Sequence, residues 1–250
     1  MGAKTGYAAP LLRVLGLRPG QRAAHYLWCE PDAGVRLLLE AYRDADLAQA
    51  AAAIIRGWAD EDPRALWERL RAEGPAKCPP ADAREVARLT MLAEWAFRRG
   101  IPESGFCGES STETGKRSSA DGTAIAIGLT GGLPATVAPD ARQVDPSTLP
   151  PGTVVYMDPP YQDTTGYAHD LPRSQVVELA ERWSAAGATV AISEAVGLAA
   201  DLEGKWFEVD ITGERRGQKR TFSRQQREVV TLNRSPAWRP SVQATLFGAA

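Results

Sequence analysis

The chain has 250 residues and 44% hydrophobic residues, which is enough to bury the core of one domain or of one domain with an insertion. Two histidines and three widely spaced cysteines without a CxxC pair argue against a zinc centre, and no apolar run is long enough to span a bilayer. We therefore expect a cytoplasmic protein without metal or signal peptide, and the net charge of −2 restricts nucleic-acid binding to a local basic patch.

The first predicted elements are a polar loop and a short strand. Residues 2–10 form the loop, which carries Lys4, and residues 25–29 are predicted as a strand. An acid-to-glycine turn from Glu30 to Gly34 follows at the carboxyl end of this strand. A glycine in such a turn lets the backbone approach a ligand closely.

Three helical segments follow this turn. Residues 37–58 predict a helix that breaks near Asp44, where Asp44 or Asp46 can cap the second half. Two further helices are predicted over residues 64–73 and 82–99, each beginning after an aspartate. These helices are either a packing subdomain or part of a target-recognition region.

A long polar segment follows the helices. Residues 100–132 are rich in glycine, serine and threonine and carry the adjacent basic pair Lys116 and Arg117. Long polar loops in compact enzymes are usually functional or disordered, so we expect this one to contact a target.

An acid, two prolines and an aromatic residue then stand at the end of an apolar strand. The strand covers residues 153–157, and Asp158, Pro159, Pro160 and Tyr161 follow it. Each proline has a fixed φ and pushes the preceding residue toward extended geometry. Such a segment can simply end a strand. It can also present acceptors where ligands bind open α/β sheets, at the carboxyl ends of their strands.

These residue types suit chemistry on an exocyclic amine. The nitrogen lone pair of such an amine is delocalised into its ring, which makes it a poor nucleophile. The Asp158 carboxylate and the Pro159 carbonyl can accept hydrogen bonds from the amine and free that lone pair, while Tyr161 offers a ring for stacking.

The rest of the chain alternates strands with a helix. A helix is predicted over residues 172–186 and strands over 189–193, 206–211 and 228–233, which favours a largely parallel sheet. Between Gly213 and Arg227 there are six basic residues and one acid, a net charge of +5. This segment is either a solvated hairpin tip or a contact to phosphates.

The motif Asp158-Pro159-Pro160-Tyr161 matches that of amino-group methyltransferases that use S-adenosylmethionine. With Thr164-Thr165-Gly166-Tyr167 and the downstream segments, residues 151–234 resemble Dam-like DNA adenine methylases of phages and prophages. The resemblance implies a Rossmann-like α/β methyltransferase domain over residues 1–234, with a helical and loop insertion over residues 48–135 and a flexible tail over residues 235–250. It also implies that the last two strands form a hairpin with one antiparallel member.

The resemblance assigns roles to further residues. Asp158, Pro159, Pro160 and Tyr161 are the implied catalytic residues. The implied S-adenosylmethionine-binding residues are Lys4, Glu30, Gly34, Asp44, Asp46 and Asp158. The candidate DNA-binding residues, partly from charge and partly from the resemblance, are Tyr167, Arg215, Arg216, Lys219, Arg220 and Arg224, with Lys116 and Arg117 in the polar segment.

The expected function is therefore methyl transfer to the exocyclic N6 amino group of adenine in DNA. RNA adenine or guanine and the N4 position of DNA cytosine are alternative substrates. The turn after the first strand has Asp32 and Val35-Arg36 where the family has phenylalanine and a second glycine, so a non-catalytic DNA-binding protein is another alternative. Gln243-Ala244-Thr245-Leu246-Phe247 resembles peptides that dock on the sliding clamp, although such short patterns also arise by chance.

Overall fold

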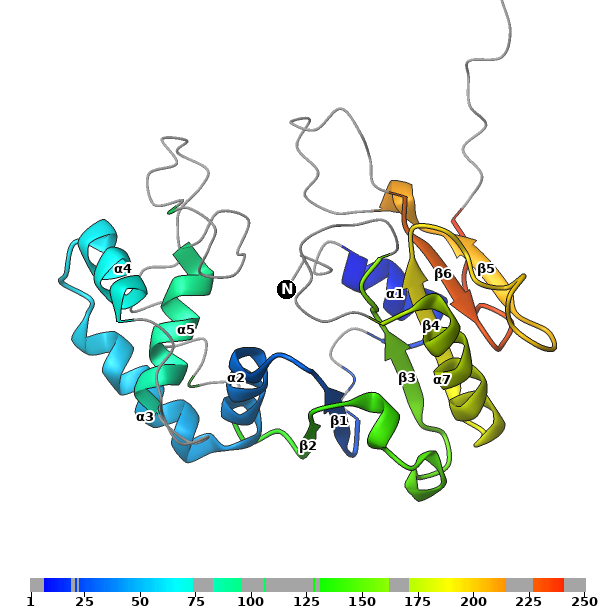
Figure 1. Cartoon of the computed structure of the whole chain (residues 1–250), viewed down its shortest axis with the longest axis horizontal. Helices are drawn as coiled ribbons and strands as arrows, with labels where there is room; N and C mark the ends of the chain where they lie inside the picture. Colours follow the sequence, from blue (N-terminus) through cyan, green and yellow to red (C-terminus); the bar gives the residue numbers. More distant parts are fainter. Residues whose placement is uncertain are drawn as a thin grey trace, which may run out of the picture. The chain divides into compact units, whose positions relative to one another are not determined.

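The computed structural model describes residues 7–18, 21, 23–73, 83–95, 106, 128, 131–161, 171–214 and 227–240. They divide into two compact units, each of which combines helices with strands (Figure 1). The first unit runs from Ala23 to Ala141, and the second joins helix α1 (Ala8–Val14) to the residues from Arg142 onward. The chain is therefore a mixed α/β protein, as its sequence predicts. No helix among these residues is long and apolar enough to cross a bilayer.

The first unit places four helices beside a two-stranded parallel sheet. Strand β1 (Tyr26–Cys29) pairs with β2 (Ala135–Ala138), with Tyr26 opposite Ala135. The helices are α2 (Ala33–Arg43), α3 (Ala45–Gly57), α4 (Pro63–Ala72) and α5 (Ala83–Trp95). A short 3₁₀ turn, η3 (Ala141–Gln143), follows β2.

Aspartates begin three of these helices. The carboxylate of Asp32 accepts a hydrogen bond from the Val35 amide at 2.8 Å, and Asp62 does the same for Ala65 at 2.8 Å. Asp44 is extended, with φ −104° and ψ 110°, and separates α2 from α3. The predicted break near Asp44 is confirmed, because an extended residue ends one helix and its side chain caps the next.

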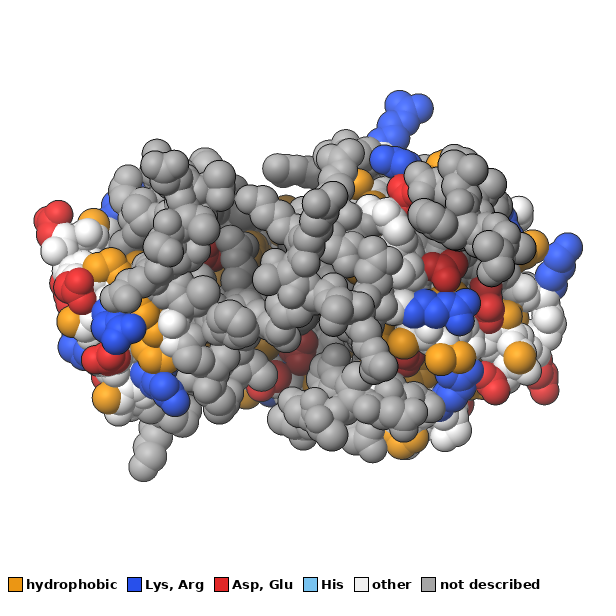
Figure 2. Space-filling model, turned by 90° about the horizontal axis from the view of Figure 1, so that it is seen from above, with side chains coloured by type: hydrophobic (Ala, Val, Ile, Leu, Met, Phe, Trp, Pro, Cys, Tyr) orange, Lys and Arg blue, Asp and Glu red, His pale blue; other side chains and the backbone are white. Residues whose placement is uncertain are grey.

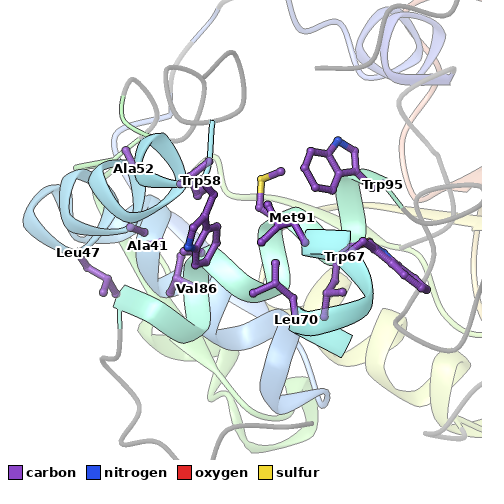
Figure 3. Packing of buried hydrophobic residues seen from close by; sticks show 14 residues of the cluster. Ala41, Leu47, Ala52, Trp58, Trp67, Leu70, Val86, Met91 and Trp95 are labelled. Atoms are coloured by element: carbon purple, nitrogen blue, oxygen red, sulfur yellow. The ribbon is translucent and has the colours of Figure 1, made fainter. Parts of the chain in front are cut away.

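The core of the first unit lies between α3, α4 and α5. Figure 3 shows Trp58, Trp67 and Met91 among the side chains that meet there. Within this core Arg88 donates to both carboxylate oxygens of Glu85, at 2.6 and 2.7 Å, and both residues are buried. A buried ion pair of this geometry is tolerated because each charge satisfies the other.

The second unit contains a four-stranded mixed sheet in the order β3-β4-β6-β5. Strand β3 (Val154–Met157) is parallel to β4 (Thr189–Glu194), and α7 (Arg173–Ala185) connects them. Strand β6 (Val229–Leu232) lies between β4 and β5 (Phe207–Asp210) and is antiparallel to both. The 3₁₀ turns η4 (Pro146–Thr148) and η5 (Thr212–Glu214) precede β3 and follow β5.

The pattern of buried residues follows from the positions of the strands and of α7 in the second unit. Every residue of β4 and β6 is buried, because these two strands are central in the sheet. Helix α7 buries Val176, Leu179, Ala180 and Trp183, the spacing of one helical face. The predicted helix and strands of this part of the chain are confirmed, with ends shifted by one residue at most, as is the antiparallel last strand.

Candidate functional site

The predicted catalytic motif lies at the carboxyl end of β3. Because β3 and β4 are parallel and Met157 is opposite Ile192, Asp158 and the end of β4 lie at the same edge of the sheet. Asp158 is exposed, whereas Pro159 is buried. The acid of the motif is therefore accessible to solvent, while the proline next to it packs against protein.

Tyr161 is bound by a residue that sequence reasoning missed. Its hydroxyl donates to the carboxylate of Glu228, with both oxygens at 2.9 Å. The exposed fractions are only 5% for Tyr161 and 3% for Glu228. Burial, with the negative charge of Glu228 next in size, raises the pKa of the Tyr161 phenol well above its ordinary value. The hydroxyl is thus a fixed donor at neutral pH.

A second tyrosine belongs to the same edge. The hydroxyl of Tyr156 donates to Ser193 at 3.0 Å, which links β3 to β4. Tyr156 is 39% exposed, and the partial burial of its phenol, to which the charge of Asp158 adds, raises the pKa of that phenol. Glu194 ends β4 opposite Val229, next to Glu228, so this edge of the sheet collects several carboxylates. Among the described residues no group of three or more metal-binding side chains is present.

The segment with a net charge of +5 begins and ends at this edge. Glu228 donates its amide to the Thr212 hydroxyl at 2.9 Å, and the Ile211 amide donates to the Glu228 carbonyl at 2.9 Å. Arg227 pairs with Asp210 at 3.1 Å on the surface. The two ends of the basic segment are therefore held together beside the residue that binds Tyr161.

The candidate cofactor turn after β1, in the first unit, is stabilised by its own side chains. The carboxylate of Glu30 accepts the Asp32 amide at 2.9 Å, and the Arg36 guanidinium donates to the Glu30 carbonyl at 2.8 Å. At Gly34 a Cβ atom would lie 3.2 Å from the Asp32 carboxylate and 3.5 Å from Leu89. The unusual residues Asp32 and Arg36 thus order the turn, Asp32 as a helix cap and Arg36 as a donor.

Asp44 and Asp46 lie at the start of α3. One carboxylate oxygen of Asp44 accepts the amides of Asp46 and Leu47 at 2.9 and 3.0 Å. The interpretation of Asp44 as a helix cap is confirmed. A role for either aspartate in holding the ribose of a cofactor stays a prediction.

Several predicted site residues lie outside the described residues. These are Lys4, Lys116, Arg117, Tyr167, Arg215, Arg216, Lys219, Arg220 and Arg224, together with the peptide from Gln243 to Phe247. On the face shown in Figure 2, the described basic side chains lie among acidic ones and form no patch of one sign. The DNA-binding roles of these residues therefore stay predictions.

The contact between Tyr161 and Glu228 has only a faint signal in the sequence. Glu228 is an acid directly before four apolar or small residues of a buried strand, Val229–Leu232. An acid at the entrance of a buried strand needs a partner, but the partner is 67 residues away and cannot be identified from spacing.

Comparison with known proteins adds no family to these observations. No protein-family model matches the chain, and no curated protein matches it. The functional interpretation therefore depends on the motif at the end of β3 and on its surroundings in the second unit.

Proposed function

We propose that the protein transfers a methyl group from S-adenosylmethionine to the exocyclic N6 amino group of adenine in DNA. The observation that carries this proposal is the exposed Asp158, which follows a strand end and precedes two prolines and a tyrosine. The sheet topology is in keeping with it, since the resemblance implies a terminal hairpin with one antiparallel strand and β6 is antiparallel to both neighbours.

In this proposal the chain acts mainly by orienting the amine. Asp158 and the main-chain carbonyl of Pro159 accept hydrogen bonds from the two N6 hydrogens of an extruded adenine. These acceptors draw the nitrogen toward tetrahedral geometry and stabilise the positive charge that develops on it. The stiffness that the prolines give to the segment reduces the reorganisation needed when the base arrives.

Tyr161 supplies the stacking surface. The residue is 5% exposed and its hydroxyl is bound to Glu228, so stacking of an adenine requires that the ring face be uncovered. Base-extruding enzymes pay an unstacking cost of a few kcal/mol and recover part of it by stacking on an aromatic ring.

The turn after β1 has residues that suit a cofactor with hydroxyl and amino groups. Glu30 uses one carboxylate oxygen for the Asp32 amide at 2.9 Å, and its other oxygen can accept from a ribose hydroxyl or an amine. Gly34 leaves open the space that a Cβ would take beside Asp32. When bound, S-adenosylmethionine supplies an electrophilic methyl group on a sulfonium, and the residues of this chain bind and orient the amine that accepts it.

A second candidate function is DNA binding without catalysis. The specific observation that favours it is in the candidate cofactor turn after β1. There the Arg36 guanidinium donates hydrogen bonds to the carbonyls of Glu30 and Pro31, at 2.8 and 2.5 Å. Calorimetry with S-adenosylmethionine separates the two functions. Binding that is lost in Asp158→Ala supports the enzyme, whereas no binding at about millimolar cofactor supports the non-catalytic protein.

Transfer of labelled methyl groups tests the proposed reaction. The purified protein is incubated with tritiated S-adenosylmethionine and, separately, with duplex DNA and with RNA of mixed sequence. We expect label in DNA that hydrolysis assigns to N6-methyladenine. The matched control for Asp158→Ala is Asp145→Asn, since Asp145 caps η4 in the same unit and is not part of the motif. Label only in RNA would reject DNA as the substrate.

A further inference from the structure

We propose that Glu228 is a positioning residue that sets the orientation of the Tyr161 ring for stacking. This inference rests on the proposed methyl transfer and adds a residue to it from outside the motif. Glu228 directly precedes β6, the last strand of the chain, and Tyr161 is the last residue of the motif.

The hydrogen bond between these residues is well placed to fix a ring. The Tyr161 hydroxyl is equidistant from the two carboxylate oxygens, at 2.9 Å from each. The Tyr161 hydroxyl oxygen lies on the axis about which the ring turns, so its bond to Glu228 and its attachment to the backbone together fix the direction of that axis. Because a phenolic O–H lies close to the plane of its ring, donation to Glu228 also favours one rotation of the ring about the axis. The backbone end is held too, because Tyr161 follows two prolines with fixed φ.

The acceptor itself is rigidly placed. The Glu228 amide donates to the Thr212 hydroxyl at 2.9 Å, and its carbonyl accepts from the Ile211 amide at 2.9 Å. Its side chain is buried, where an ionised carboxylate is tolerated only with hydrogen-bond donors. The structure thus provides the supporting contacts that hold a site residue in one geometry.

The orientation of Tyr161 matters because Asp158 and the Pro159 carbonyl lie only a few residues before it. A base that stacks on the ring is thereby aligned with the two acceptors. A displacement of about 1 Å of a bound substrate can cost about a hundredfold in rate. Loss of the Glu228 carboxylate should therefore lower the rate of methyl transfer without removing any group that touches the reacting atoms.

The test compares variants at Glu228 in two backgrounds. Methyl transfer is measured with tritiated S-adenosylmethionine on genomic DNA from a methylase-free host, which offers every target sequence. The variants are Glu228→Ala, Glu228→Gln, Glu228→Asn and Tyr161→Phe, with the double variant Tyr161→Phe/Glu228→Ala. Glu208→Ala is the control, since Glu208 accepts a hydrogen bond from the Ala199 amide in the same unit.

We expect Glu228→Ala to lower kcat about tenfold or more and to change the KM for S-adenosylmethionine by less than about twofold. Glu228→Gln should keep kcat within about threefold of the wild type, because its amide oxygen still accepts the Tyr161 hydroxyl. Glu228→Asn is one methylene shorter and should behave like Glu228→Ala. In the Tyr161→Phe background, Glu228→Ala should cost less than about threefold, because the hydroxyl it acts through is gone.

Equal losses from Glu228→Ala in both backgrounds, or equal losses in the Gln and Asn variants, would overturn the positioning role. If the Ala variant does not fold, the comparison of Gln with Asn decides alone. A folded wild type that labels neither DNA nor RNA overturns the proposed function itself. That outcome is distinct from an active wild type whose variants show no coupling.

Discussion

The hydroxyl of Tyr161 lies 2.9 Å from each carboxylate oxygen of Glu228, although the two residues are 67 positions apart. This bond joins the segment that follows β3 to the residue that precedes β6 and therefore connects the candidate catalytic motif to the last strand of the chain. It also places that motif beside the basic segment, whose last residue, Arg227, pairs with Asp210 at the end of β5.

Removing the hydroxyl should destabilise the second unit. Tyr161→Phe removes the charge-assisted hydrogen bond that Tyr161 donates to the buried Glu228 carboxylate, and such a loss typically costs about 1–3 kcal/mol. Urea denaturation at pH 7 measures the free energy of unfolding. Tyr156→Phe is the control, because the hydroxyl of Tyr156 donates to a neutral acceptor, the Ser193 hydroxyl. This variant should lose less free energy of unfolding than Tyr161→Phe. Equal losses in the two variants would contradict the charge-assisted bond.

The same bond predicts a pH dependence in alkaline solution. Burial and the charge of Glu228 raise the pKa of Tyr161 in the folded protein, while an unfolded phenol has a pKa of about 10. The resulting stability is complete below pH about 10 and is lost as the pH rises further, because only the unfolded chain then gives up the proton. Tyr161→Phe removes this contribution.

The slope of the unfolding free energy against pH, measured between about pH 10 and pH 11, checks this predicted pH dependence. Tyr161→Phe should make that slope shallower by up to about 1.4 kcal/mol per pH unit. Identical slopes in the wild type and the variant would show that the Tyr161 phenol is not shifted.

Local signals made much of the fold predictable. The aspartates at 44 and 62 begin helices because their short acceptors reach free amides, and the break at Asp44 follows from the same chemistry. The helix predicted from residue 37 begins earlier, at Ala33, because Asp32 caps it in the same way. Strand β2 (Ala135–Ala138) was not predicted, because four small or β-branched residues give too short a pattern. The Tyr161–Glu228 contact was also not predictable, since a bond across 67 residues exists only once the sheet has formed.

The buried pair of Arg88 and Glu85 makes a prediction for the first unit. Arg88→Ala leaves the Glu85 carboxylate buried without its bidentate partner, and such losses cost about 3–5 kcal/mol. Replacing both residues by apolar ones, as in Glu85→Leu/Arg88→Met, should recover most of this stability. Thermal unfolding compares the three proteins, and a double variant as unstable as Arg88→Ala would contradict the role of the unpaired charge.

Cys29 should react slowly with alkylating reagents. Burial, with a smaller contribution from Asp140, raises the pKa of its thiol to about 11. At pH 8 the reactive thiolate should be about two-hundredfold scarcer than for an ordinary thiol of pKa about 8.5. In a Cys78→Ser/Cys107→Ser protein, Cys29 is the one thiol that can be alkylated. Its alkylation rate in the native state is compared with its rate in urea. Equal rates would mean that Cys29 is not shielded.

The two interpretations of Asp44 can be separated by a cap-competent substitution. Asp44→Ala should cost about 1 kcal/mol of stability because α3 loses its cap, and Asp44→Ser should restore it. We expect Asp44→Ser also to keep the wild-type affinity for S-adenosylmethionine, measured by calorimetry. A stable Asp44→Ser variant with weakened cofactor binding would assign the carboxylate to the cofactor instead.

The most direct test of the central claim is the DNA of a methylase-free bacterial host that expresses this protein. Mass spectrometry of its nucleosides and sequencing of its modified bases report activity, base identity and target sequence together. The account predicts N6-methyladenine at a defined sequence with the wild type, and none with a folded Asp158→Ala variant. Host DNA without modified bases, or with N4-methylcytosine alone, would contradict it.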